Sequence, residues 1–164
     1  MSPDWPTYAI LGAVTLERLA ELPYARANTT RLLATGGHEV APGHYPFIVL
    51  LHAAWLAALW WWAPGQAIHW DWLALFALIE LARIWTLTTL GRRWTTRIIV
   101  VPGEKLVARG PYRFVNHPNY VVVVAEIAVL PLVFGLWEVA LLFTALNAIA
   151  LWVRIRAENW ALGR

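Results

Sequence analysis

The chain has 164 residues, of which 60% are hydrophobic and 14% are charged, and its mean hydropathy is +0.54. A typical soluble domain has about 45–50% apolar and about 25% charged residues, so the composition indicates one membrane-embedded domain. The chain contains no cysteine, which excludes disulfides, thiolate nucleophiles and thiolate metal sites. The net charge of +3 is small, so the placement of the charges matters more than their sum.

Five apolar segments follow one another along the chain. They cover residues 8–22, 46–63, 70–90, 120–134 and 136–153. A helix needs roughly 20 apolar residues to span a bilayer, so the second, third and fifth fit, and the first and fourth need flanking residues. Little more than Gly135 separates the last two, which predicts a tight helical hairpin, and Pro118 suits the first turn of the fourth helix. We predict an all-α integral membrane protein with about five transmembrane helices.

Basic residues lie in every second connection between these segments. They are Arg26 and Arg31, then Arg92, Arg93, Arg97, Lys105, Arg109 and Arg113, and in the tail Arg154, Arg156 and Arg164. The positive-inside rule then places the N-terminus outside and the C-terminus in the cytoplasm. The long link between the third and fourth segments therefore forms a cytoplasmic cap. These basic residues fit anionic lipid better than nucleic acid.

The long cytoplasmic link has local signals of its own. Residues 97–101 are rich in β-branched side chains, Pro102-Gly103 is a turn signal, and residues 104–108 follow, which predicts a short hairpin on the membrane. Residues 109–120 then form the densest polar and aromatic run of the chain.

Ionisable residues inside the apolar segments are candidates for function, because charge is costly in a bilayer. Glu80 and Arg83 are three residues apart and either neutralise each other or line a pocket. His52 is either a packing residue or a ligand. Glu126 has no basic neighbour at helical spacing. These four residues are candidates for a substrate pocket. Three further charged residues are expected to pair or be solvated at the cytoplasmic end of the first helix: Glu17, Arg18 and Glu21.

The fifth segment carries polar residues on one helical face. Asn147, Leu151, Arg154 and Glu158 occur at i, i+4, i+7 and i+11. Arg154 and Glu158 would form an ion pair, which is either part of a site or a plain surface pair. The usual glycine-rich nucleotide motifs and the H-E-x-x-H metal motif do not occur, so no metal site is predicted.

The pattern G-P-Y-R-x-x-x-H-P-x-Y at residues 110–120, followed by a helical hairpin and R-x-x-x-E at Arg154 and Glu158, resembles the isoprenylcysteine carboxyl methyltransferase family. The similarity covers about residues 97–162. The N-terminal part, with Glu17-Arg18, Gly36-Gly37 and His44-Tyr45-Pro46, is similar to a bacterial branch of that family. Some members of that branch O-methylate long-chain alkylresorcinols or alkylpyrones made by type III polyketide synthases.

The resemblance implies S-adenosylmethionine as the methyl donor, bound at the cytoplasmic face of a bacterial inner membrane. The implied cofactor contacts are Val107, Gly110, Tyr112, His117, Tyr120, Glu158 and Asn159. Arg154 would face the reaction centre and act with His117 in catalysis. Related sequences commonly carry two adjacent glutamates in the last motif, where this chain has Glu158 and Asn159.

The implied organisation is one domain, 1–164. Residues 1–90 form three N-terminal helices, and residues 91–164 form the cofactor-binding loop, the hairpin and the C-terminal helix. The implied reaction methylates an oxygen, of a phenol, enol or carboxylate, on a hydrophobic lipid-like molecule. A phenol has a pKa near 10 and would need help from His117, His52 or Glu126 as a base, or from Arg154 as a cation. The alternatives are an NADPH-dependent membrane reductase and a non-enzymatic membrane module.

Overall fold

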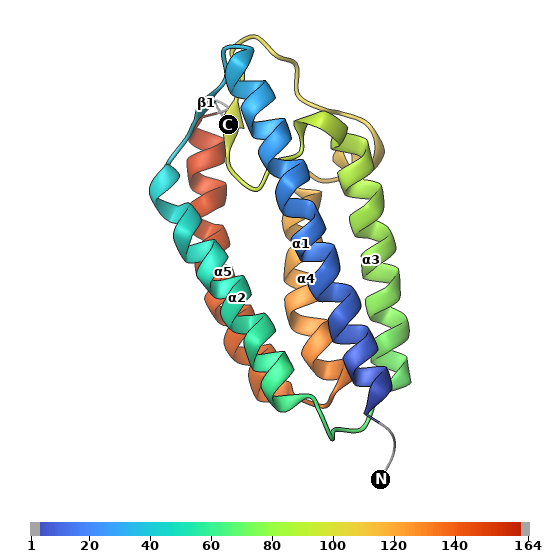
Figure 1. Ribbon diagram of the computed structural model, residues 1–164. Helices are drawn as coiled ribbons and strands as arrows, with labels where there is room; N and C mark the ends of the chain where they lie inside the picture. Colours follow the sequence, from blue (N-terminus) through green and yellow to red (C-terminus); the bar gives the residue numbers. More distant parts are fainter. Residues whose placement is uncertain (1–3, 162–164) are drawn as a thin grey trace.

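A computed structural model describes residues 4–161 of the chain, so Arg164 lies outside the described residues. The helices run side by side along one axis, and the start of α1 and the end of α5 lie at opposite ends of the bundle (Figure 1). They are α1 (Trp5–Ala34), α2 (Tyr45–Trp62), α3 (Trp70–Leu90), α4 (Pro118–Val133) and α5 (Trp137–Ala161).

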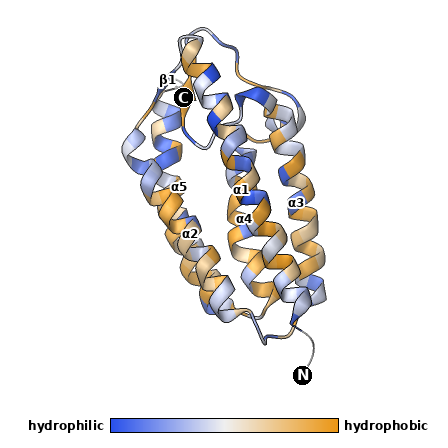
Figure 2. Ribbon diagram, in the orientation of Figure 1, coloured by the Kyte–Doolittle hydropathy of each residue, from blue (hydrophilic) through white to orange (hydrophobic). Residues whose placement is uncertain are grey.

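Three helical stretches are long and apolar enough to cross a membrane, and a fourth is apolar but shorter. The long ones are Pro42–Trp62, Trp70–Arg93 and Trp137–Ala161, and the shorter one is Pro118–Val133. Hydrophobic residues fill the length of the bundle, and hydrophilic residues gather at the end that carries the α3–α4 link (Figure 2). The predicted all-α membrane fold is confirmed, whereas the count of five spans and their orientation stay predictions.

The first helix is much longer than the apolar segment that predicted it. It begins at Trp5, passes through Pro23 and ends at Ala34. Beyond Pro23, the buried residues Ala25, Asn28 and Leu32 follow at helical spacing, so this polar half packs one face against the rest of the protein. A search for apolar spans stops before it. Glu17, Arg18 and Glu21 therefore lie in the middle of a helix, and the prediction that they sit at its end was wrong.

The cap is closed by a two-stranded ladder that joins two links. Strand β2 (Ile99–Val100) pairs antiparallel with β1 (His38–Glu39), so the predicted local hairpin with residues 104–108 was wrong. The β-branched run does form a strand, but its partner lies in the α1–α2 link. Gly37 allows this return: its N–H donates to Leu32 O at 2.9 Å, and a Cβ there would lie 2.7 Å from that oxygen.

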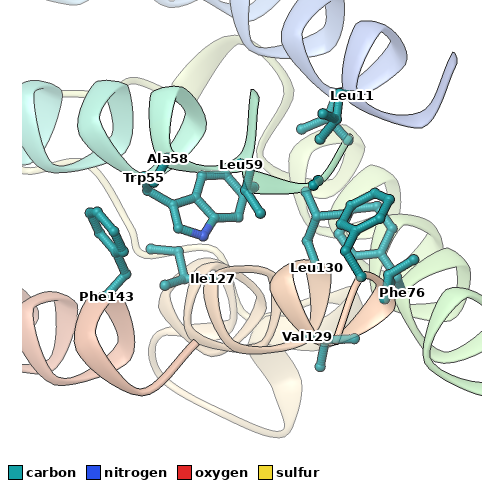
Figure 3. Packing of buried hydrophobic residues seen from close by; sticks show 13 residues of the cluster. Leu11, Trp55, Ala58, Leu59, Phe76, Ile127, Val129, Leu130 and Phe143 are labelled. Atoms are coloured by element: carbon teal, nitrogen blue, oxygen red, sulfur yellow. The ribbon is translucent and has the colours of Figure 1, made fainter. Parts of the chain in front are cut away.

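Side chains on all five helices form the hydrophobic core (Figure 3). Its members include Leu11 of α1, Leu59 of α2, Phe76 of α3, Leu130 of α4 and Phe143 of α5. They lie in the half of the bundle that is distant from the cap. The α4–α5 hairpin closes this end through Gly135, at a φ of 68°, which confirms the predicted turn. The half of the bundle next to the cap is less tightly filled.

Candidate active site

Two cavities lie in the half of the bundle next to the cap. The first, here the cap cavity, has a volume of about 210 Å³ and lies between the α3–α4 link and the facing ends of α4 and α5. The second, here the bundle cavity, has a volume of about 300 Å³ and lies among α1, α2, α4 and α5. Both are lined by Trp94, Thr95, Asn119, Tyr120 and Arg154. The two cavities therefore meet at the start of α4.

The start of α4 fixes two of the predicted site residues side by side. His117 is the N-cap residue and Pro118 occupies the first turn, where a missing N–H costs no hydrogen bond. Tyr120 follows in the same turn, and the rings of His117 and Tyr120 stack with their centroids 5.3 Å apart. The predicted role of Pro118 is confirmed. The motif thus presents a ring nitrogen and a hydroxyl to the cap cavity from a rigid helix start.

The end of α5 meets this pair of rings. Nε of Arg154 donates to the Tyr120 hydroxyl at 2.9 Å, and that hydroxyl donates to the Glu158 carboxylate. Nε2 of His117 lies 3.1 Å from Oδ1 of Asn159, and its Nδ1 lies 3.7 Å from Glu158. Within the described residues Arg154 and Glu158 form no direct ion pair, so that prediction was wrong. Tyr120 bridges them, as both acceptor and donor.

The predicted polar stripe on α5 is confirmed in its order and its burial. Asn147, Leu151 and Arg154 are all buried, and Glu158 is partly exposed one turn beyond them. The first three line the bundle cavity, and Glu158 lines the cap cavity. One helical face therefore connects the two cavities, with the Arg154 guanidinium at the point where they meet.

The residues before α4 contribute to the cap cavity in different ways. Val107 and Tyr112 line it, and burial together with the nearby Glu158 carboxylate raises the pKa of the Tyr112 phenol, which keeps it neutral. Gly110 lies instead against α3, where a Cβ would stand 2.6 Å from Oγ1 of Thr89 at a φ of +56°. Only glycine fits this close approach, so Gly110 shapes the turn η3 (Gly110–Arg113) that carries Tyr112.

Charged residues from three helices form a cluster beside the bundle cavity. Arg83 of α3 donates to Glu126 of α4 at 3.0 and 2.9 Å and to Glu21 of α1 at 2.8 Å. Arg18 of α1 lies 2.9 Å from Glu126 and 3.8 Å from Glu80. Of the two alternatives for Glu80 and Arg83, mutual neutralisation was therefore wrong, because the partners of Arg83 come from other helices. Spacing within one helix could not reveal this.

The four residues predicted to line a substrate pocket do not all line the same cavity. His52 and Arg83 line the bundle cavity, whereas Glu80 and Glu126 lie in the charged cluster and line neither cavity. Sequence reasoning missed Trp94, which is buried and lines both cavities. The available signal was an aromatic residue within the basic link. Asn28 of α1 holds that segment in place, because its amide donates to Trp94 O at 2.8 Å.

Fold and site together define a small helical membrane protein in which a capped polar cavity joins a cavity between helices. The sequence model of the isoprenylcysteine carboxyl methyltransferase (ICMT) family matches residues 72–164, and the chain belongs to this family. It is also 37% identical over 161 residues to the uncharacterized protein YpbQ of Bacillus subtilis (strain 168), covering 94% of this chain and 95% of that protein. No solved structure gives a match to the chain. Family membership supports methyltransferase activity at a membrane.

Proposed function

We propose that the protein transfers a methyl group from S-adenosylmethionine to an oxygen of a hydrophobic, lipid-like molecule at the cytoplasmic membrane face. The observation that supports this most directly is the meeting of the two cavities at Tyr120 and Arg154. A donor in the cap cavity and an acceptor in the bundle cavity would meet there and nowhere else in the described chain. Methyl transfer depends above all on such positioning and on the exclusion of water.

The side chains of the cap cavity suit a zwitterionic cofactor. The Glu158 carboxylate is the anion that an ammonium group needs, and the Arg154 guanidinium is a donor for a carboxylate. Oδ1 of Asn119 is buried without a hydrogen-bond partner and lines the same cavity. A buried acceptor of this kind is costly unless a ligand satisfies it, so it favours a bound molecule with N–H or O–H groups. When bound, S-adenosylmethionine supplies an electrophilic methyl group.

The protein's own residues then have separate tasks. Glu158, held by the Tyr120 hydroxyl, binds the cofactor's ammonium, and Asn159 fixes the ring of His117. Within the described chain, Oδ1 of Asn159 accepts a hydrogen bond from His117 and so orients its ring. This role needs an oxygen acceptor but not the second glutamate carboxylate of related sequences. Tyr112 and Val107 close the cavity against water. Gly110 supports Tyr112 through its packing on α3.

Arg154 is the residue placed to act on the acceptor. Its Nε donates to the Tyr120 hydroxyl, and its two Nη atoms make no hydrogen bond within residues 4–161. It is buried and lines both cavities. A cation fixed there stabilises negative charge on the attacking oxygen in a water-poor site, which is a large contribution to catalysis in many enzymes. His117 lines the cap cavity but not the bundle cavity, so its task lies on the cofactor side.

The acceptor would enter from the bilayer and place its polar head at Arg154. Leu19 and Leu22 of α1 and Val49 of α2 line the bundle cavity and are exposed on the outside of the bundle. A long alkyl chain fits such a cavity, as in the alkylresorcinols and alkylpyrones of the branch that the N-terminal part resembles. The basic residues of the cap support a cytoplasmic site, by the positive-inside rule.

Ligand titration tests the proposal against its alternatives. Purified protein is titrated with S-adenosylhomocysteine and with NADPH by calorimetry and thermal shift. We expect stabilisation by S-adenosylhomocysteine alone, and its loss in Glu158→Gln but not in Glu138→Gln, an exposed glutamate in the first turn of the same helix. Stabilisation by NADPH alone would establish a reductase, and stabilisation by neither a non-enzymatic module. Transfer of a labelled methyl group into lipid extracts then identifies the acceptor.

A further inference from the structure

His52 is a polar side chain of the bundle cavity to which methyl transfer as described above gives no task. It lies on α2, is partly exposed and lines that cavity. Its Nδ1 is 2.8 Å from the carbonyl oxygen of Ile48. A carbonyl oxygen only accepts, so Nδ1 carries the hydrogen and the lone pair of the neutral ring is on Nε2. Nε2 makes no hydrogen bond within residues 4–161, so it is available as a base on a side chain that lines the cavity.

The other titratable groups of the bundle cavity are already engaged. These groups are Arg18 and Glu21 of α1, Tyr45 of α2, Arg83 of α3, Tyr120 of α4 and Arg154 of α5. The arginines are cations and cannot accept a proton. Glu21 receives two hydrogen bonds from Arg83, and the Tyr45 hydroxyl lies 3.2 Å from Oγ1 of Thr96. Among the described residues, His52 is therefore the neutral base that faces this cavity.

The remaining candidates for a base lie elsewhere. Glu126 is held by Arg18 and Arg83 and lines neither cavity. His117 is bonded to Asn159 and lines the cap cavity but not the bundle cavity. A hydrophobic acceptor in the bundle cavity would meet neither of them, whereas His52 and Arg154 both line that cavity.

We propose that Nε2 of His52 accepts the proton of the acceptor's hydroxyl group, a task that exists for a phenol or enol acceptor but not for a carboxylate. This inference rests on the methyl transfer proposed above. A carboxylate is already ionised at neutral pH and needs no base, whereas a phenol has a pKa near 10. A histidine with a free ring nitrogen, in a cavity whose other titratable groups are engaged or cationic, serves the second kind of acceptor.

The step balances without a further reactant. The acceptor's O–H bond breaks and its proton passes to Nε2 of His52, while the oxygen's electron pair forms the new bond to the methyl carbon. The carbon–sulfur bond of the donor breaks, and its electron pair stays on sulfur, which loses its positive charge. His52 is left as an imidazolium and returns its proton to water after the methyl ether has left.

Binding of a substrate analogue in the absence of cofactor gives the first test. The probes are a long-chain 3-alkylphenol and its methyl ether, titrated into purified protein in detergent. One hydrogen bond contributes about 0.5–1.5 kcal/mol, so the wild type should bind the phenol roughly 2–10-fold more tightly than the ether. His52→Leu should lose this preference. His69→Gln should keep it, because His69 lies at the far end of the bundle, before α3.

Labelled methyl transfer gives the second test. His52→Gln should lower the rate with the alkylphenol by about 10²–10⁴-fold, the usual contribution of a general base. The loss should be less than about tenfold for an alkylated nitrophenol that is ionised at neutral pH, since it brings no proton. In the wild type the rate should level off once His52 is neutral, whereas in His52→Gln it should rise with pH until the phenol itself ionises.

The outcomes separate this inference from the proposed function. Equal losses with both phenols, or an unchanged preference for phenol over ether in His52→Leu, would overturn the role of His52. Efficient wild-type transfer to a long-chain carboxylate but not to the phenol would do the same. If the wild type binds no S-adenosylhomocysteine, the proposed function itself fails. Retained S-adenosylhomocysteine binding shows that a variant is folded, and the wild-type comparison of phenol with ether needs no variant.

Discussion

Replacement of Arg83 by leucine should destabilise the protein severely, and a second replacement should restore much of the loss. Arg83 sits among carboxylates of α1 and α4, and its side chain is only 5% exposed. In the Arg83→Leu variant, Glu126 keeps only Arg18 as a cationic partner, at 2.9 Å, and Glu21 keeps only Arg18, at 3.5 Å. One arginine then faces the whole acidic group.

The expected magnitude follows from burial. Removing one partner of a buried ion pair costs about 3–5 kcal/mol, because the other charge stays in a medium of low polarity. Both Arg83 and Glu126, at 5% and 3% exposure, meet that condition. For a chain of this size each kcal/mol lowers Tm by roughly 2–4 °C, so Tm should fall by about 6–20 °C. The double variant Arg83→Leu, Glu126→Leu removes one charge of each sign and should recover at least half of the loss.

Thermal unfolding in detergent measures these effects for Arg83→Leu, for Glu126→Leu and for the double variant. Arg156→Leu serves as the control, since Arg156 is exposed and lies over the ring of Trp152 at 4.7 Å. It should change the free energy of unfolding by less than about 1 kcal/mol. If Arg83→Leu unfolds at the wild-type temperature, or if the two losses simply add in the double variant, the charged cluster does not stabilise the bundle as described.

Three further outcomes are expected. Tyr120→Phe removes the hydroxyl that bridges α4 to α5, and it should weaken S-adenosylhomocysteine binding by roughly 10-fold or more in calorimetry, since hydrogen bonds to charged groups contribute about 1.5–3 kcal/mol. Unchanged affinity would refute the role of this bridge in holding Glu158 for the cofactor. Gly110→Ala should lower Tm, because the new Cβ would lie 2.6 Å from the Thr89 hydroxyl oxygen. Adding Thr89→Ala to this variant should restore part of the lost Tm. An unchanged Tm in Gly110→Ala would contradict the close packing. Because the chain has no cysteine, single cysteines introduced by Gln66→Cys and Lys105→Cys report membrane topology through labelling with a thiol reagent that does not cross the membrane. The cysteine at position 66 should react from outside the cell and the cysteine at position 105 from the cytoplasm. The reverse result would invert the proposed orientation.

The apolar pattern predicted the membrane helices well, because length and hydrophobicity are local properties. The bounds of α3 agree with the segment 70–90, and the turn at Gly135 was predicted from the sequence. The second half of α1 was missed because it is a polar helix packed on the cap, and no apolar run marks it. The partner of β2 was missed for a related reason: strand pairing depends on which segments meet in space, and β1 has only two residues.

The motif residues of the site were predicted to lie on one side of the membrane, and His117, Tyr120, Arg154 and Glu158 do meet in the structure. Their pattern of contacts could not be predicted, since the expected ion pair passes through the Tyr120 hydroxyl. The partners of Glu126 illustrate the general reason. Helical spacing predicts neighbours within one helix, whereas its arginines come from α1 and α3.

The contact between Asn28 and the start of the α3–α4 link has a consequence for how the protein is made. The Asn28 amide donates to Gly91 O and Trp94 O, which lie 63 and 66 residues further along the chain. At a synthesis rate of about 5–20 residues per second, Asn28 leaves the ribosome roughly 3–13 s before those carbonyls exist. Helix α2, which is long and apolar enough to cross a membrane, is therefore complete before the cap exists to hold α1. Its insertion depends on its own hydrophobicity and flanking charges, and the end of the protein that carries the two cavities is assembled last.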